Sequence, residues 1–113
     1  MRSLYSYVLL SASVVACGGA PVPAKSASEV QAEIRAAEAI GAQTLPLASL
    51  HLKLARDQAA QADALMANGD NDEARLALQR AKADAELAIL VTKQAELRAR
   101  ADAASKRADA ASR

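Results

Sequence analysis

The residues best placed to do chemistry in this chain are a single cysteine, Cys17, and those directly before it. A basic residue, Arg2, is followed by an apolar run over residues 4–15 and then by a small residue, Ala16, next to the thiol. This order is typical of a secretory signal. As a helix, the apolar run would span about 18 Å, well short of the ~30 Å hydrocarbon core of a bilayer. We therefore expect residues 1–16 to be a cleaved signal and not a permanent membrane helix.

The residues around the expected cleavage position resemble the pattern that bacterial lipoprotein signal peptidases recognise. Val14, Val15 and Ala16 precede Cys17, the only cysteine of the chain. The resemblance implies cleavage between Ala16 and Cys17 and a diacylglycerol on the Cys17 sulfur, with two or three acyl chains giving a stable anchor. It also implies the bacterial cell envelope. Because Gly18 stands where an aspartate would favour the inner membrane, we expect the periplasmic face of the outer membrane, with the inner membrane and the cell surface as alternatives.

Beyond Cys17, few residues have the types and spacing that catalysis or metal binding requires. His51 is the only histidine, so it has no second histidine with which to share a metal. Asp70, Asp72 and Glu73 lie close together but lack the glycine and the ligand spacing of a calcium loop. The two tyrosines both lie in the signal, so bases have no aromatic side chain to stack on in the mature chain. We expect no enzyme activity, no metal, no cofactor and no nucleic-acid partner.

The composition of the chain predicts that its elements are helices. Alanine is the most frequent residue, Glu, Lys, Arg, Gln and Leu supply much of the rest, and proline occurs only at positions 21, 23 and 46. From Cys17 onward the chain has 13 basic and 13 acidic residues, because Arg2 is the one charged residue of the signal. No bulk charge therefore attracts nucleic acid. We expect an all-α fold, either an antiparallel helical hairpin or a three-helix arrangement, with a long alanine-rich C-terminal helix.

Changes in composition divide the mature chain into three parts. The glycines and prolines of residues 17–25 favour a flexible tether behind the lipid. A helical domain is expected over residues 26–97. The tail, residues 98–113, repeats RADAASK as RADAASR with only alanine as an apolar residue, so we expect a solvated helix that is either stable or frayed. Its five basic and two acidic residues give a net charge of +3, which either aids solubility or makes a weak contact with peptidoglycan or lipid headgroups.

Capping patterns predict where the helices of the domain begin and end, over residues 28–40, 46–68 and 71–97. Ser26 and Glu29 have the spacing of a capping box before the first helix. Gly69 is expected to end the second helix in a left-handed conformation. Asp70, with Glu73 three residues later, is expected to cap the third helix in the same way as Ser26 caps the first.

The spacing of apolar residues predicts which helix faces are buried. On the second helix we expect a packing stripe formed by Leu47, Leu50, Leu54 and Leu65. On the third helix we expect close helix contact along Leu78, Ala81, Ala85 and Ala88. A different face of the same helix carries Leu76, Leu87, Leu90 and Leu97. Two apolar faces predict packing on both sides, one against the second helix and the other against the first helix, a second copy or a protein partner.

The segment from Leu45 to Ala88 resembles the bacterial family known as domain of unknown function 4398. The resemblance rests on the leucine-spaced helix PLASLHLKLARDQAAQADAL and on the turn and helix ANGDNDEARLALQRAKADAELA. It implies a helical hairpin in a short envelope lipoprotein and no established activity. We expect a non-enzymatic lipoprotein that is anchored to the membrane and presents a helical interaction or assembly surface. The alternatives are a structural spacer between membrane and cell wall and a small periplasmic chaperone or transport accessory.

Overall fold

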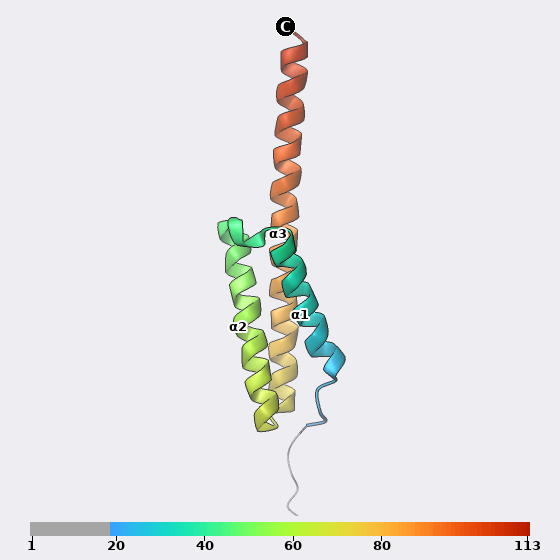
Figure 1. Ribbon diagram of the computed structural model, residues 1–113, viewed down its shortest axis with the longest axis vertical. Helices are drawn as coiled ribbons and strands as arrows, with labels where there is room; N and C mark the ends of the chain where they lie inside the picture. Colours follow the sequence, from blue (N-terminus) through green and yellow to red (C-terminus); the bar gives the residue numbers. More distant parts are fainter. Residues whose placement is uncertain (1–18) are drawn as a thin grey trace, which may run out of the picture.

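The computed structural model describes residues 19–113 and folds them into three α-helices (Figure 1). These are α1 (Ala24–Ala39), α2 (Pro46–Asn68) and α3 (Asn71–Ala111), with a short 3-10 turn, η1 (Ala42–Thr44), between α1 and α2. The predicted all-α class with a long C-terminal helix is confirmed, and of the two predicted arrangements the structure has the three-helix one. The predicted signal and Cys17 lie outside the described residues.

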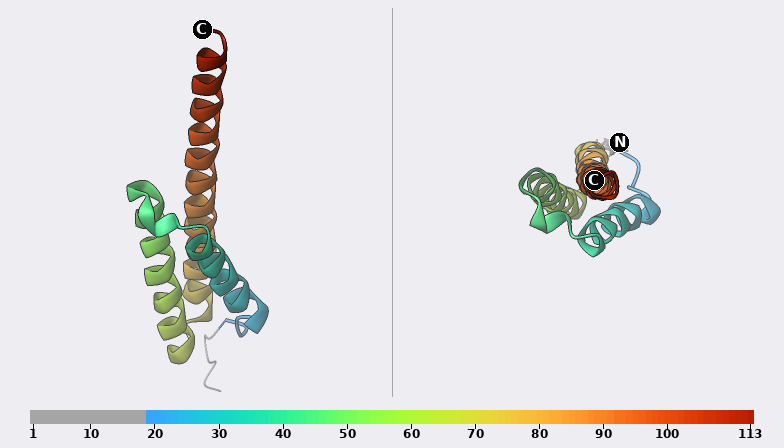
Figure 2. Two further views of the ribbon diagram at one scale, coloured as in Figure 1. Left: turned by 45° about the horizontal axis from the view of Figure 1, so that its top comes forward. Right: turned by 90° about the horizontal axis from the view of Figure 1, so that it is seen from above.

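The three helices run up, down and up again along one axis (Figure 1). α2 is antiparallel to α3, whereas α1 is parallel to it. Seen from above, the helices form a triangle (Figure 2). Only the first half of α3 lies in this bundle. Its second half extends alone beyond the connection between α1 and α2, and residues 96–113 are all exposed. The tail predicted as helical or frayed is therefore helical as far as Ala111.

The turn between α2 and α3 depends on Gly69, which has a φ of 83°. A side chain with a Cβ disfavours this left-handed conformation, so glycine suits the position. The N–H groups of Gly69 and Asp70 donate to the carbonyls of Met66 and Leu65, at 3.1 and 2.9 Å, and so close the last turn of α2. The left-handed helix end predicted at Gly69 is observed, and α3 begins two residues later.

Neither of the predicted capping boxes forms. α3 begins after Asp70 without a hydrogen bond from a capping side chain, and Glu73 contributes negative charge to the first turn, which favours the helix dipole. α1 begins at Ala24, four residues earlier than predicted, because Pro23 has a φ of −59° that suits the start of a helix. Ser26 therefore lies inside the first turn and cannot cap it.

The core of the bundle consists mainly of alanine. Small side chains on both helices allow α2 and α3 to approach closely. The buried residues of α2 are Ala48, Leu52, Ala55, Ala59 and Ala62. Those of α3 are Ala74, Ala77, Leu78, Ala81, Ala85, Ala88 and Thr92. α1 covers one side of this pair with Val30, Ile34 and Ala37.

The leucine stripe predicted to pack on α2 is not the buried face of that helix. Leu47 and Leu50 are 54% and 51% exposed, and Leu54 and Leu65 are only partly buried. The buried face is the neighbouring stripe of four alanines and Leu52. The prediction was wrong for Leu47 and Leu50, whereas Leu65 packs against the edge of the core. Alanine stripes on two helices pack together at a short distance between the backbones, which leucines in the same place would prevent.

Candidate functional site

The chain directly after the predicted lipidation site is bound to the base of α3. The Asn71 side chain donates a hydrogen bond from Nδ2 to the carbonyl of Gly19, at 3.0 Å. The Arg75 guanidinium donates to the carbonyl of Ala20, at 2.8 Å. Both bonds join residues more than fifty positions apart in the chain. They hold the beginning of the described chain at the end of the bundle where α2 turns into α3.

Of the flexible tether predicted over residues 17–25, the last two residues are part of a helix instead. Ala24 and Lys25 belong to α1, and residues 19 and 20 are bound to α3. An added Cβ at Gly19 would lie 2.6 Å from the carboxylate of Asp72, which is the end of a flexible and mostly exposed side chain. Cys17 itself lies outside the described residues.

An exposed apolar row follows the side of α3 that faces away from the bundle. It contains Leu76, Leu87, Leu90 and Leu97, which are 42–63% exposed. We name the surface that contains them the outer face of α3, formed by Leu76, Arg80, Ala83, Leu87, Leu90, Gln94 and Leu97. The sequence predicted that this face packs against something. The structure leaves it open, and α1 packs beside α3 without covering it.

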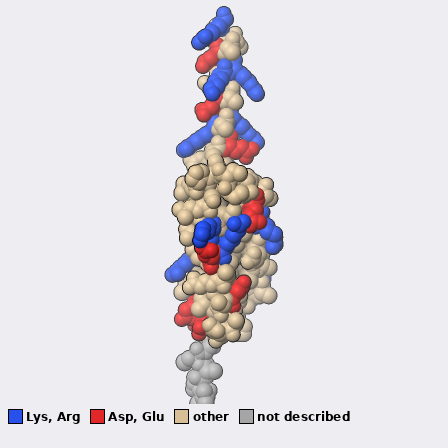
Figure 3. Space-filling model, turned by 60° about the vertical axis from the view of Figure 1, so that its left-hand side comes forward, with Lys and Arg blue, Asp and Glu red and all other residues tan. Residues whose placement is uncertain are grey.

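A second uncharged surface lies where α2 begins. Figure 3, which turns the α2 side forward, shows a broad area without Lys, Arg, Asp or Glu on the upper part of the bundle. Leu47 and Leu50, which were predicted to be core residues, are exposed at this level. Ile40, at the end of α1, is 42% exposed close by in the chain. Above this area the free part of α3 carries interspersed charges of both signs.

A polar cluster joins α2 to α3 below the uncharged area. Nδ1 of His51 lies 2.8 Å from one carboxylate oxygen of Asp84, and Nε2 of Gln58 donates to the other oxygen at 2.9 Å. The side chains of His51 and Asp84 are 23% and 16% exposed. The remaining amide atom of Gln58, Oε1, is buried and has no hydrogen-bond partner among residues 19–113.

The geometry of the hairpin brings these three residues together. Because α2 and α3 are antiparallel around Gly69 and Asp70, Asp84 lies opposite a position on α2 between His51 and Gln58. The sequence showed His51 only as the single histidine and did not predict its contact with Asp84. The usable signal was that His51 and Gln58, seven residues apart on one helix face, both interrupt the apolar pattern of α2.

The polar cluster does not line either of the two hollows between α1 and α3. A histidine and carboxylate pair can move a proton only for a nucleophile or substrate held next to it. Two hollows on the described surface, of about 210 and 450 Å³, lie between α1 and α3 and are lined by other residues. Within residues 19–113, no three His, Cys, Asp or Glu side chains gather so that they could hold a metal ion. What the hydrogen bonds of the cluster do show is a contact between α2 and α3.

None of the helices in the described chain has an apolar stretch that would cross a bilayer. Comparison of the chain with protein-family models, with curated proteins and with solved structures finds no match in any of the three.

Proposed function

We propose that this protein is a non-enzymatic lipoprotein of the bacterial envelope that presents a helical surface for assembly. The observation that carries the proposal is the outer face of α3, where four leucines spread over about six helical turns are exposed to solvent. Exposed apolar side chains in a continuous row are typical of an interaction site. The buried alanine stripe of α3 lies on the opposite side, so the row is not part of the core.

The proposed anchor is a lipid on Cys17, because this cysteine and the residues before it resemble a lipoprotein cleavage site. The chain that follows this cysteine has a fixed position, since Gly19 and Ala20 are bound to Asn71 and Arg75 at the base of the bundle. Two residues reach at most about 7 Å, so a lipid on Cys17 would be attached close to Gly19. The free end of α3 lies at the opposite end of the molecule (Figure 1). The outer face of α3 would then run from Leu76, near the attachment point, towards the free end of the helix.

One experiment in intact cells tests both the anchor and the surface. A photoreactive amino acid replaces Leu90, and cells are labelled with palmitate and irradiated. We expect a palmitate-labelled, crosslinked product, and we expect the label to disappear with Cys17→Ser. The control places the same photoreactive group at Asp63, an exposed position on α2. Palmitate label that persists in Cys17→Ser would contradict the anchor, and crosslinking that is equal at positions 63 and 90 would contradict the surface.

A spacer between membrane and cell wall is the second candidate function. It is favoured by the free part of α3, whose residues 98–113 carry a net charge of +3. Peptidoglycan is anionic, so a weak contact has a physical basis. In the same cells, recovery of the labelled protein with the insoluble cell-wall fraction would favour the spacer over the assembly surface.

A further inference from the structure

The outer face of α3 has the period of a coiled coil. Leu76, Ala83, Leu90 and Leu97 follow one another at intervals of seven residues, and between them lie Arg80, Leu87 and Gln94. Alternating steps of four and three residues place all seven on one narrow side of the helix. All seven are exposed. The same period continues on the free part of α3 as Ala101, Ala104, Ala108 and Ala111, which are exposed as well.

The described chain does not fill this seam. α1 reaches only its border, where Ile40, Ile89, Leu90 and Lys93 help to line a hollow of about 450 Å³. Leu90 nevertheless stays 61% exposed, and Leu97, which lies beyond the end of α1, is 63% exposed. A helix from elsewhere could lie along the outer face of α3 on the side away from the buried stripe, where it would border α1 only near Glu86, Leu90 and Lys93.

We propose that the outer face of α3 pairs with the outer face of a second copy, and that the two α3 helices run antiparallel. This deepens the proposed function, since it names the partner of the assembly surface. Leu87 of each copy then packs against Leu90 of the other, so the two central layers of the seam both join leucine to leucine. Outside them, Ala83 meets Gln94 and the aliphatic stem of Arg80 covers Leu97.

The charges beside the seam support the antiparallel orientation. In coiled coils, the residues flanking the apolar seam form ion pairs that set partner choice and orientation. Glu86 and Lys93 occupy equivalent flanking positions one heptad apart, on the same side of the seam, and both are exposed. Within residues 19–113, neither of them forms an ion pair. When Leu87 faces Leu90 of the second copy, Glu86 faces Lys93 of that copy, and symmetry makes this pair twice.

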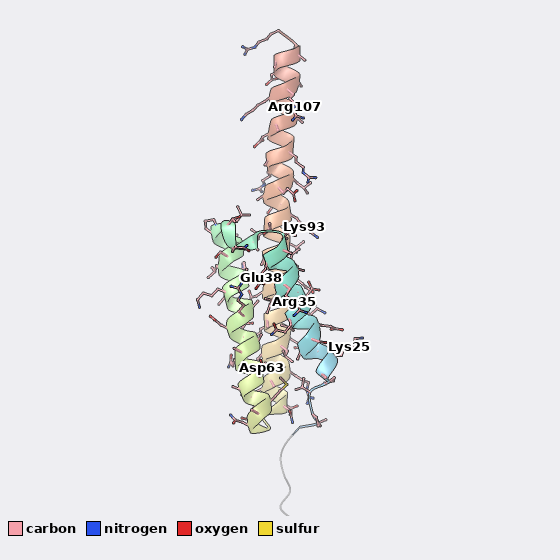
Figure 4. All side chains as sticks on the ribbon, in the orientation of Figure 1. Lys25, Arg35, Glu38, Asp63, Lys93 and Arg107 are labelled. Carbon is pink, nitrogen blue, oxygen red and sulfur yellow. The ribbon has the colours of Figure 1, made fainter. Side chains whose placement is uncertain are left out.

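A parallel pair would bring like charges together. Arg80 would stack on its own counterpart inside the seam, and Lys93 would face Arg98 of the second copy across its edge. Figure 4 shows Lys93 at the level where α1 ends, with Arg107 far along the free part of α3. The antiparallel arrangement places Arg80 against an apolar residue and leaves no like-charged pair facing across the central heptads.

Disulfide trapping tests both the partner and the orientation. The full chain carries Cys17→Ser in mild detergent, so that lipid plays no part in the result, and two variants add Ala83→Cys or Gln94→Cys at exposed positions. After the two variants are mixed and oxidised, we expect the mixed Ala83→Cys and Gln94→Cys disulfide to exceed both homodisulfides. As the matched control, Asp63→Cys is mixed with either variant in place of the other. This mixture should give no dominant disulfide.

Sedimentation of the same Cys17→Ser chain supplies an independent readout. We expect twice the monomer mass, and loss of the dimer with Leu90→Glu while the helical circular dichroism is kept. Dominant self-crosslinking of Gln94→Cys would show parallel pairing and overturn the orientation. A monomer without trapped disulfides would overturn the proposal itself. If photocrosslinking at position 90 in cells then captured a different protein, the proposed function would stand while this inference fell.

Discussion

At the scale of single residues, the side chains that hold α2 to α3 are of two kinds. The first is alanine, whose small size sets the distance between the helices. The second is the cluster of His51, Gln58 and Asp84, whose hydrogen bonds of 2.8 and 2.9 Å pass between the helices at the edge of the alanine contact. Asp84 is the shared acceptor, so its loss would leave the two α2 side chains without partners.

Replacing Asp84 with alanine should destabilise the fold by about 1–3 kcal/mol, because partly buried donors would lose their acceptor. The measurement is thermal or urea unfolding followed by helical circular dichroism. Asp63→Ala is the matched control, since Asp63 is exposed and has no ion pair within the described chain. Equal stability of both variants would show that the cluster contributes nothing to the fold.

At the scale of the helices, local signals in the sequence define the ends of α2 and the start of α3. Pro46 and Gly69 act through backbone geometry alone, and both are found where the sequence placed them. The start of α1 and the capping boxes were predicted less well, because several residues in a row could cap a helix and only tertiary contacts choose among them. In α1 the N-cap position is taken by Pro23, three residues before Ser26.

The buried face of α2 could not be predicted from side-chain size because two stripes compete. The leucines of the exposed stripe offer more apolar surface, but the alanines of the other stripe match the alanines of α3. Which stripe of α2 is buried depends on the shape of the facing helix, so the sequence of α2 alone does not reveal it. On α3 the predicted stripe of Leu78, Ala81, Ala85 and Ala88 is buried. That prediction already included the small residues that form the contact.

The complete burial of Ala81 between the helices predicts that this position does not tolerate a larger side chain. Ala81→Leu should lower the free energy of unfolding by about 1–3 kcal/mol. The larger side chain must either force the helices apart or adopt an unfavourable rotamer. Ala60→Leu is the control, because Ala60 lies on the exposed side of α2. The urea midpoint of each variant is the measurement. A stable Ala81→Leu protein would mean that the helices pack less closely than described.

At the scale of the whole molecule, the protein has a bundle at one end and a single helix at the other. The bundle protects its backbone hydrogen bonds by packing, whereas the end of α3 has no neighbour in the described chain. An unsupported helix of this length is only marginally stable in water. The proposed pairing would extend support as far as Ala101 and leave the remaining residues uncovered.

Hydrogen exchange should therefore divide α3 into two regions. Amides of residues 102–111 should exchange much faster than amides of residues 74–92, because local fraying opens the free end without unfolding the bundle. Peptide-resolved mass spectrometry of the Cys17→Ser chain measures this difference. Uniform protection along all of α3 would contradict the expected fraying and would mean that some other surface covers the tail.

The hydrogen bonds from Asn71 and Arg75 to the backbone near Gly19 also determine how the molecule would bear a mechanical load. A pull on the N-terminal side, resisted at the far end of α3, would first strain these two bonds. It would then draw α1 lengthwise against α3, since these helices are parallel (Figure 1). In such a shearing geometry, all contacts between the two helices share the force, whereas peeling would break them one after another. A protein tethered at this end would resist tension along its axis better than tension across it.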